Sequence, residues 1–399
     1  MGNSMKYYIK TVCWVVILLF TSGGIIQTFF MNMGMSADRI GIYTAAVNIM
    51  QIVTMILSFF LADNIKRVRA IDALLSLAPL LITLSMLPFC FVEKVDKDLL
   101  FYIAMGSCIA ENIFVGIKNI VTYRLPYLIF DMDKYAYYEN NAQMISGIVS
   151  IAAGLVITVT SKVFDFKLVM AAGFVITSLL SIFSALVIYC MKEQNKFEEK
   201  TVENILPKLK RKDYAYFYIP NLIRGFSNGI MGMIAVIYAK NITKDTASVS
   251  GLVTVLSVSL VVGPAVYQML RIKFKTDFIY FLGGLMMFVF LPLMLAGKSA
   301  TVFYIFYFLT GIGFNIVAVA GAIHAAETFS YEDIGSFTSI RLIIFMAGTA
   351  IASYAVGKVV ETMPSLAILI ICGVCQMVSG IMYMAYRKQK SNRNARYVN

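Results

Sequence analysis

The feature that most constrains this chain is a series of apolar runs, each long enough to cross a lipid bilayer. Hydrophobic residues make up 59% of the 399 positions and charged residues only 14%. A bilayer core requires about 20 apolar residues in a helix, because no water is present there to satisfy the backbone polar groups. The sequence therefore predicts an all-α polytopic membrane protein with twelve transmembrane helices. The expected spans are 8–31, 41–62, 71–91, 99–117, 142–160, 168–190, 214–238, 247–270, 277–296, 301–323, 336–357 and 365–386.

The basic residues are distributed unevenly between the two sides of these spans. Of the 34 Lys and Arg, 23 fall on one side, including the segment that begins at Lys118, and nine on the other, while Arg224 and Arg341 lie inside spans. Basic loops face the cytoplasm, so an even number of spans places both termini there. The net charge of +12 then indicates membrane orientation and contact with anionic lipid headgroups on the cytoplasmic side, and it does not indicate nucleic-acid binding.

The longest polar stretch divides the chain into two halves. We expect a six-helix bundle over 1–191, a cytoplasmic linker over 192–213, and a second six-helix bundle with a basic cytoplasmic tail over 214–399. Within the linker, apolar residues recur at the spacing i, i+3, i+4, i+7 from Val202 to Leu209. This pattern predicts a short amphipathic helix on the inner leaflet, and a flexible connector remains the alternative.

The two halves carry matching residues at equivalent places, which indicates an internal repeat. The matches are Arg67 with Arg271, Arg69 with Lys273, Leu87-Pro88 with Leu291-Pro292, Ser22 to Ile25 with Ser227 to Ile230, and Ala153-Gly154 with Ala347-Gly348. Two six-helix halves in parallel repeat are one of the plans used by secondary transporters, in which the substrate lies between the halves.

The segment Leu61 to Arg69, with the sequence LADNIKRVR, resembles the loop signature between the second and third helices of the major facilitator superfamily. Asp63 occupies the acidic position and Arg67 a basic one, whereas Phe59 and Lys66 replace the two glycines of the signature. The resemblance extends over the whole chain in architecture, but the motif is degenerate and no subfamily can be assigned.

In that superfamily the loop carboxylate is implied to accept hydrogen bonds from the start of a helix in the opposite half. The resemblance thus implies a conformational gate that contains Asp63 and Arg67, with the helix start near Gly335 and Ser336 as the partner. Arg341 is assigned to the same cytoplasmic gate. An anion at a helix N-terminus is stabilised by about 0.3–1 kcal/mol. The alternative reading of Asp63 is a solvated loop acid.

Two charged residues lie near the middle of expected spans. Glu111 is in the fourth span and Arg224 in the seventh. A charge at mid-bilayer costs at least about 2.5–3.5 kcal/mol on insertion scales, so each is a candidate functional residue. The resemblance implies that spans one, four, seven and ten line a central cavity. We expect Glu111 to carry a coupling proton and Arg224 to bind the solute, and a structural ion pair is the alternative.

Uncharged polar residues occur at similar depths and are candidates to orient the solute. They are Gln27, Gln51, Asn228 and Asn315, of which Asn315 is the counterpart of Glu111 in the repeat. An Asn or Gln in a span bonds a neighbouring helix about as often as it binds a ligand, so both readings stay open.

The sequence lacks the motifs that would indicate an enzyme. It contains no HExxH motif, no dense Cys/His cluster and no complete phosphate-binding loop. We therefore expect no metal and no cofactor, with a proton as the coupling ion.

The residues together indicate a monomeric, multi-pass transporter in a bacterial plasma membrane that moves a small solute by alternating access. Proton-coupled efflux of hydrophobic, drug-like compounds is the alternative within transport, favoured by the 53 aromatic residues and 24 Met. A non-transporting receptor or sensor on the same fold is the alternative from another class.

Overall fold

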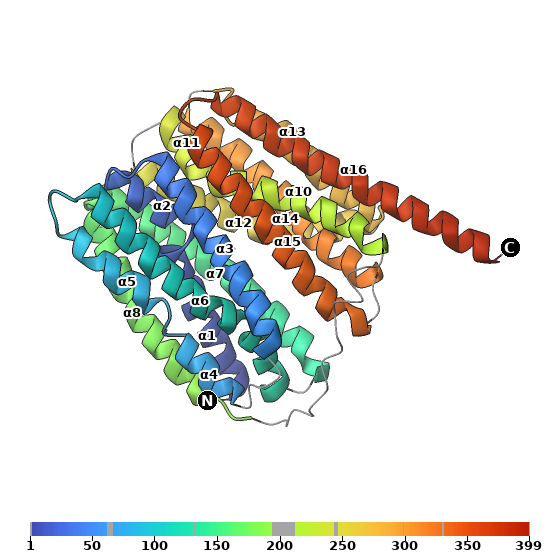
Figure 1. Ribbon diagram of the computed structural model, residues 1–399, viewed down its shortest axis with the longest axis horizontal. Helices are drawn as coiled ribbons and strands as arrows, with labels where there is room; N and C mark the ends of the chain where they lie inside the picture. Colours follow the sequence, from blue (N-terminus) through green and yellow to red (C-terminus); the bar gives the residue numbers. More distant parts are fainter. Residues whose placement is uncertain are drawn as a thin grey trace. The chain divides into compact units, whose positions relative to one another are not determined.

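The computed structural model describes residues 2–61, 67–130, 132–193, 212–242, 246–297, 299–328 and 331–398, and in these ranges every regular element is a helix (Figure 1). The helices of the first half are α1 (Asn3–Thr21), α2 (Gly23–Asn32), α3 (Ala37–Leu61), α4 (Val68–Leu75), α5 (Leu80–Met86), the 3₁₀ helix η2 (Leu87–Cys90), α6 (Lys97–Ile129), α7 (Met132–Val163) and α8 (Phe166–Tyr189). Those of the second half are α10 (Lys212–Gly232), α11 (Ile234–Asn241), α12 (Thr246–Arg271), α13 (Thr276–Leu293), α14 (Ala300–Thr328), α15 (Tyr331–Val359) and α16 (Ser365–Val398).

The helices are long and apolar enough to account for the twelve expected spans. In the described residues, eleven continuous or nearly continuous segments pass as membrane spans by length and composition, and the pair formed by α10 and α11, bent by 42°, makes a twelfth. The prediction of a polytopic all-α protein with twelve spans is thereby confirmed. Of the predicted linker over 192–213, residues 194–211, which include the predicted amphipathic helix, lie outside the described residues.

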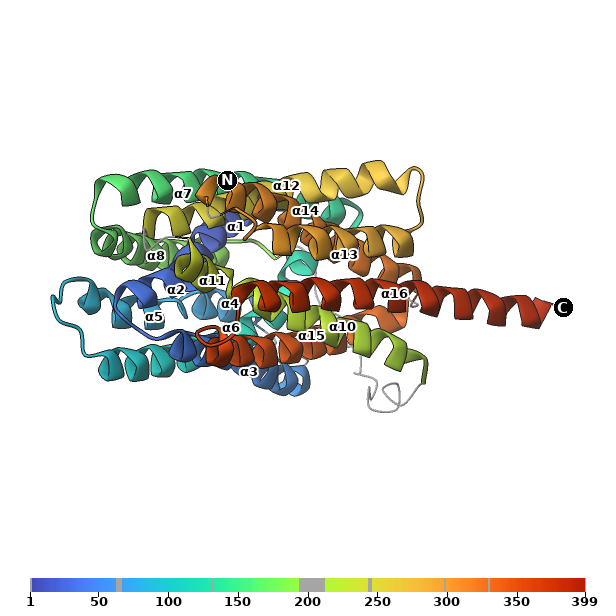
Figure 2. The same cartoon turned by 90° about the horizontal axis from the view of Figure 1, so that it is seen from above.

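Several helices are longer than the apolar runs from which they were predicted. α6 continues to Ile129 and α7 begins at Met132, so the connection between the fourth and fifth spans is helical on both sides. α15 begins at Tyr331, five residues before the expected start at 336. α16 continues to Val398, and Figures 1 and 2 show it running beside α13 and extending past it. An apolar run predicts only the part of a helix that lies in the lipid. The hydrogen-bonded helix can continue beyond that part into polar sequence.

Three spans are interrupted, and two of the interruptions have a local cause. Gly23 has φ +68°, a left-handed conformation that breaks the first span between α1 and α2 and that only glycine adopts without strain. In the third span, Pro79 lacks an N–H, and the turn before it is held by i→i+3 bonds such as Leu80 N to Leu77 O. The seventh span bends where α10 ends at Gly232 and α11 begins at Ile234.

The contacts divide the chain into two compact units. One comprises Met1–Val202 together with Lys244–Ser257, and the other comprises Glu203–Thr243 together with Val258–Asn399. Inside the first unit, α1 packs on α7 and α8, α4 packs on α6 and α8, and α6 contacts α7. Inside the second, α10 packs on α15 and α16, α13 packs on α14 and α16, and α14 contacts α15. These pairs of neighbouring spans therefore recur in both halves, at the positions that the sequence repeat predicts.

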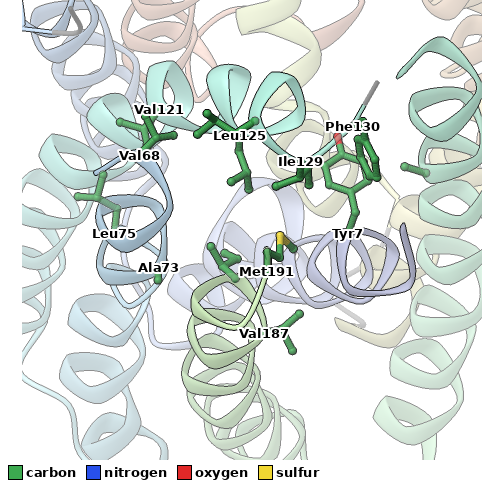
Figure 3. Packing of buried hydrophobic residues seen from close by; sticks show 13 residues of the cluster. Tyr7, Val68, Ala73, Leu75, Val121, Leu125, Ile129, Phe130, Val187 and Met191 are labelled. Atoms are coloured by element: carbon green, nitrogen blue, oxygen red, sulfur yellow. The ribbon is translucent and has the colours of Figure 1, made fainter. Parts of the chain in front are cut away.

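The first unit has a buried apolar cluster to which α1, α4, α6, α7 and α8 contribute residues (Figure 3). Tyr7 of α1 packs edge-on against Phe130, with the ring centroids 5.4 Å apart. The side chain of Asn3 closes the same end, because its amide donates to the carbonyls of Ile129 and Lys192 at 3.2 and 2.7 Å. The first bond satisfies the last carbonyl of α6, which its own helix leaves free, and the second holds the chain just beyond the end of α8.

In the second unit, α10 and α15 approach so closely that backbones touch. A Cβ added at Gly225 would lie 2.0 Å from the Phe345 carbonyl oxygen, and one added at Gly229 would lie 2.4 Å from that of Thr349. On the facing helix, a Cβ at Gly348 would lie 2.3 Å from the Leu222 carbonyl oxygen. Gly225 and Gly229 form a GxxxG pair, the spacing that lets membrane helices pack at backbone distance.

Candidate functional site

In the first unit, the candidate proton carrier Glu111 lies on the buried side of α6. Its exposed fraction is 6%, and Tyr43 of α3 and Cys108, one turn earlier on α6, lie within electrostatic reach of it. Within this unit, and among the residues that the structure describes, no basic side chain pairs with Glu111 and no hydrogen bond to its carboxyl group is found. Glu111 is therefore a buried acid whose carboxyl group has no structural partner in the described part of its own unit.

The neighbouring residue Asn112 connects α6 to α3. Its side-chain oxygen accepts a hydrogen bond of 2.8 Å from the Gln51 amide, and its own amide donates to the Cys108 carbonyl. Close approach of the two helices is possible because Gly116 has no side chain, since a Cβ there would lie 1.9 Å from the Thr54 hydroxyl. Gln51 thus takes part in a helix-to-helix bond one residue from Glu111.

Gln27 of α2, like Gln51, is bonded to a neighbouring helix. Its exposed fraction is 2%, and its amide nitrogen lies 3.2 Å from the Thr44 hydroxyl of α3. The amide oxygen of Gln27 is buried and has no hydrogen-bond partner in the described part of the chain. The amide nitrogen of Gln27 therefore links α2 to α3, and the amide oxygen could accept a hydrogen bond from a solute.

In the second unit, the structure brings Arg224 of α10 and Arg341 of α15 into one neighbourhood. Their guanidinium groups lie within electrostatic reach of each other although the residues are far apart in sequence. Nε of Arg224 and Nη1 of Arg341 are buried and have no hydrogen-bond acceptor among the described residues. The Arg224 guanidinium lies over the Phe345 ring, 5.0 Å from its centroid.

The residues beside this arginine pair are aromatic and hydroxyl-bearing. Tyr280 of α13 and Tyr383 of α16 are fully buried, with their ring centroids 4.3 Å apart. The Tyr280 and Ser379 hydroxyls are hydrogen-bonded at 2.9 Å, and the Asn221 amide donates to the Tyr383 hydroxyl at 3.1 Å. In the second unit's described residues, no carboxylate pairs with either arginine.

Asn228 and Asn315 both bond a neighbouring helix. The Asn228 amide donates to the Thr349 hydroxyl of α15 at 3.3 Å. The Asn315 amide donates to the Ser259 hydroxyl of α12 and to the carbonyl one turn earlier, at Gly311. Asn112 makes the same pair of links in the first unit, so by its contacts Asn315 corresponds to Asn112 rather than to Glu111.

The gate residues are only partly described. Asp63 lies outside the described residues, and so do the side chains of Gly335 and Ser336. Arg67 is exposed and immediately precedes α4. Gly335 and Ser336 were expected at the start of a helix, but α15 begins at Tyr331, so they lie inside it. Arg341, assigned to the gate from sequence, lies beside Arg224.

One buried charge cluster was missed by sequence reasoning. Asp72 of α4 is fully buried, and its carboxylate lies 3.0 Å from Lys10 Nζ and 3.3 Å from Lys118 Nζ. Thr122 donates to the same carboxylate at 2.7 Å, and Lys118 also donates to Ser76 at 2.6 Å. Lys118 was expected in a cytoplasmic loop, which is wrong, because α6 continues past it and buries it to 2% exposure.

The signal that would have found this cluster is an acid inside the third expected span. Asp72 is the second residue of the run 71–91, and charges so near the end of a run ordinarily reach the headgroups. Here both lysines point inward, and Lys118 lies over the Trp14 ring, 4.5 Å from its centroid. The three charges sum to a net positive charge inside the first unit.

The buried charges of the two units could bind an ion or a charged solute. The described residues contain no group of three or more His, Cys, Asp and Glu side chains placed to hold a metal. They contain instead an uncommitted acid in one half and an uncommitted pair of arginines in the other. Such charges inside membrane spans mark solute or proton pathways in membrane proteins.

Comparisons with known proteins identify the fold. No protein-family model matches the chain, and no curated protein matches its sequence. The structure of the nucleoside transporter NupG matches with a TM-score of 0.72 at 14% identity, over 97% of this chain and 100% of that one. A single-substitution variant of NupG gives a TM-score of 0.73 at 14% identity, over 96% of this chain and 99% of that one.

A third solved structure is also similar. It is a bacterial homologue of the human lysosomal transporter Spinster, in an inward-facing and occupied conformation. It matches with a TM-score of 0.69 at 10% identity, over 97% of this chain and 98% of that one. These neighbours are transporters of the major facilitator superfamily, and the chain has the fold of that superfamily, as the resemblance in the sequence implied.

Proposed function

We propose that this protein is a proton-coupled secondary transporter that moves a small solute across a bacterial plasma membrane by alternating access. It works as a monomer with both termini in the cytoplasm. The fold supports the transporter part of this proposal, since the similar structures are those of transporters. The observation that carries the coupling part is the state of Glu111, which is buried in its unit without a basic partner among the described residues.

A buried, ionised carboxylate is costly unless a second charge balances it. At Glu111 that balance must be provided by a proton or by a cationic group that arrives during the transport cycle. A site with two alternative ways of being neutralised couples proton movement to solute movement. Glu111 therefore carries the proton in our proposal.

The other candidate residues have supporting roles. Arg224 binds the solute, and Gln27, Gln51, Asn228 and Asn315 orient it or hold the helices that do so. Asp63 and Arg67 belong to the cytoplasmic gate. Gln51 bonds to Asn112 and Asn228 bonds to Thr349, each on a neighbouring helix. These bonds favour the role of holding the helices for Gln51 and Asn228.

The test begins with the identification of a solute. The purified protein is screened for a rise in melting temperature against nucleosides, sugars, amino acids, organic anions and cationic dyes. Nucleosides are included because NupG is a nucleoside transporter. A preference for cationic dyes would favour the drug-efflux alternative.

The solute that stabilises the protein most is then used, in labelled form, in proteoliposomes. Wild type accumulates it against its gradient when a pH gradient is imposed. Glu111→Gln loses this accumulation but still exchanges labelled for unlabelled solute at equal pH, because exchange requires no net proton movement. Asp98→Asn, at an exposed position on the same helix, serves as the control and behaves like wild type.

Two results would contradict the proposal. If Glu111→Gln accumulates solute as wild type does, Glu111 does not carry the proton. If solutes bind to the wild-type protein but none crosses the membrane, the protein is a receptor on a transporter fold.

A further inference from the structure

The two arginines of the second unit stand out in the described structure because both have unused hydrogen-bond donors. Nε of Arg224 and Nη1 of Arg341 are buried, and neither has an acceptor among the residues that the structure describes. A buried N–H without a partner costs about 1–3 kcal/mol, and more on a charged group. Two such donors in one neighbourhood would be satisfied by an acceptor that a bound solute brings to the site.

The electrostatics point in the same direction. Arg224 and Arg341 repel each other, because their guanidinium groups lie within electrostatic reach and carry the same charge. No carboxylate of the described second unit pairs with either of them. A bound anion would reduce this repulsion, and its oxygen atoms could accept hydrogen bonds from the unused donors.

The backbone fixes the spacing between the two arginines. Arg224 is followed by Gly225, and a Cβ at Gly225 would lie only 2.0 Å from the carbonyl oxygen of Phe345. Phe345 lies one turn after Arg341 on α15. α10 and α15 therefore make their backbone contact next to both arginines, which leaves the pair in place before a ligand arrives. Preorganisation of this kind reduces the cost of binding.

The surrounding side chains define what kind of anion fits. The Phe345 ring lies under Arg224, and the paired rings of Tyr280 and Tyr383 lie within electrostatic reach of Arg341. Arginine matches carboxylate and phosphate oxygens with two parallel hydrogen bonds. The site therefore suits an oxyanion that is attached to a planar or apolar body.

We propose that Arg224 and Arg341 together form a binding site for the carboxylate or phosphate group of an aromatic or otherwise apolar solute. This assignment rests on the proposed transport function and narrows its substrate class. It also changes the role of Arg341, which becomes a ligand-binding residue rather than part of the cytoplasmic gate.

The test measures binding and not transport, so that the two proposals fail separately. Purified full-length protein is titrated by calorimetry with benzoate, phenyl phosphate and the neutral analogue benzamide. We expect benzoate or phenyl phosphate to bind, and benzamide to bind about tenfold more weakly or worse, because it has no charge to balance the arginines. Equal binding of benzamide, or no binding of either anion, overturns the inference.

Variants then assign the binding to the two residues. Arg224→Gln and Arg341→Gln each weaken anion binding by about tenfold or more. Arg341→Lys keeps the positive charge but loses the paired hydrogen bonds, so its anion affinity lies between those of wild type and Arg341→Gln. Arg271→Gln, at an exposed position of the same unit, binds as wild type does. Circular dichroism and the melting temperature show whether each variant folds, and the Arg341→Lys titration decides if a Gln variant does not.

Unchanged anion affinity in folded Arg224→Gln and Arg341→Lys overturns the site. Anion binding that depends on both arginines, without flux of the bound anion, contradicts the transport function and leaves the site intact. Proton-driven accumulation of an uncharged solute, with no anion binding, supports transport and overturns this inference.

Discussion

At the scale of single residues, the described interior of the first unit holds a cluster of three buried charges. Asp72 stands between Lys10 and Lys118, and all three side chains are at most 6% exposed. In a low-dielectric interior, a lone charge costs far more than a paired one. The carboxylate of Asp72 is thus what allows both lysines to be buried.

Asp72→Asn should destabilise the protein by about 3–5 kcal/mol, because it leaves two buried lysines without a counter-charge and changes the shape of the side chain little. The measurement is chemical unfolding in mixed micelles. The matched control is Asp98→Asn, which breaks the exposed pair with Arg39 and should cost about 1 kcal/mol or less. Equal losses in the two variants would mean that the Asp72 cluster is not a stabilising unit.

The sequence identified some of these residues and missed others for a physical reason. Glu111 and Arg224 could be found because a charge in the middle of an apolar run has no route to water. Asp72 and Lys118 lie near the ends of runs, where the sequence alone does not distinguish a side chain that reaches the headgroups from one that turns inward. The proximity of Arg341 to Arg224 is a tertiary contact that no local pattern encodes.

At the scale of helices, close approach depends on a few glycines. α10 and α15 touch through Gly225, Gly229 and Gly348, where a Cβ would lie 2.0–2.4 Å from a facing carbonyl oxygen. The sequence repeat includes Gly348 and the segment that contains Gly229 among its matched residues. The helix pair itself became visible only in the structure, because the sequence does not state which faces meet.

Gly225→Ala should destabilise the protein by about 1–3 kcal/mol, since the new methyl group must push two helix backbones apart. It should also weaken binding at the arginine pair, because the adjacent Arg224 moves with α10. Gly232→Ala, on the same helix, meets nothing within 4 Å and is the control. Its unfolding free energy should equal that of wild type or rise slightly.

The measurement is thermal or denaturant unfolding of Gly225→Ala and Gly232→Ala in the same detergent, which compares their stabilities. The account of the α10–α15 contact is contradicted if Gly225→Ala is as stable as Gly232→Ala. A loss of stability with unchanged ligand binding would separate packing from the site.

The order and number of helices were predictable, while their interruptions were not. A hydropathy window detects an apolar run whether or not it is straight, so the first, third and seventh spans were expected to be continuous. The structure breaks the first at Gly23 because of its positive φ, and unwinds the third before Pro79. These interruptions depend on the backbone conformation of single residues, which the mean hydropathy of a window does not predict.

At the scale of the whole molecule, the two units repeat one pattern of helix neighbours. The first span of each half packs on the fifth and sixth spans, and the third span packs on the fourth and sixth. The sequence predicted this repeat from a handful of matched residues, and the similarity to solved transporters over nearly the full chain agrees with it. In a secondary transporter of this plan, each half moves largely as a rigid body.

The central claim is that the two units move relative to each other when a solute binds. The most direct measurement uses spin labels at two exposed positions, Glu93 in the first unit and Glu361 in the second. They are introduced as unnatural amino acids, so that the native cysteines stay in place. Pulsed electron resonance then gives the distribution of distances between the labels, with and without the solute that stabilises the protein most.

A second pair of labels within the first unit, at Glu93 and Lys162, is the control for movement inside a unit. The account predicts that solute shifts the Glu93–Glu361 distribution between two populations and leaves the Glu93–Lys162 distribution unchanged. A single Glu93–Glu361 population that does not respond to bound solute, or to a change of pH, would contradict it.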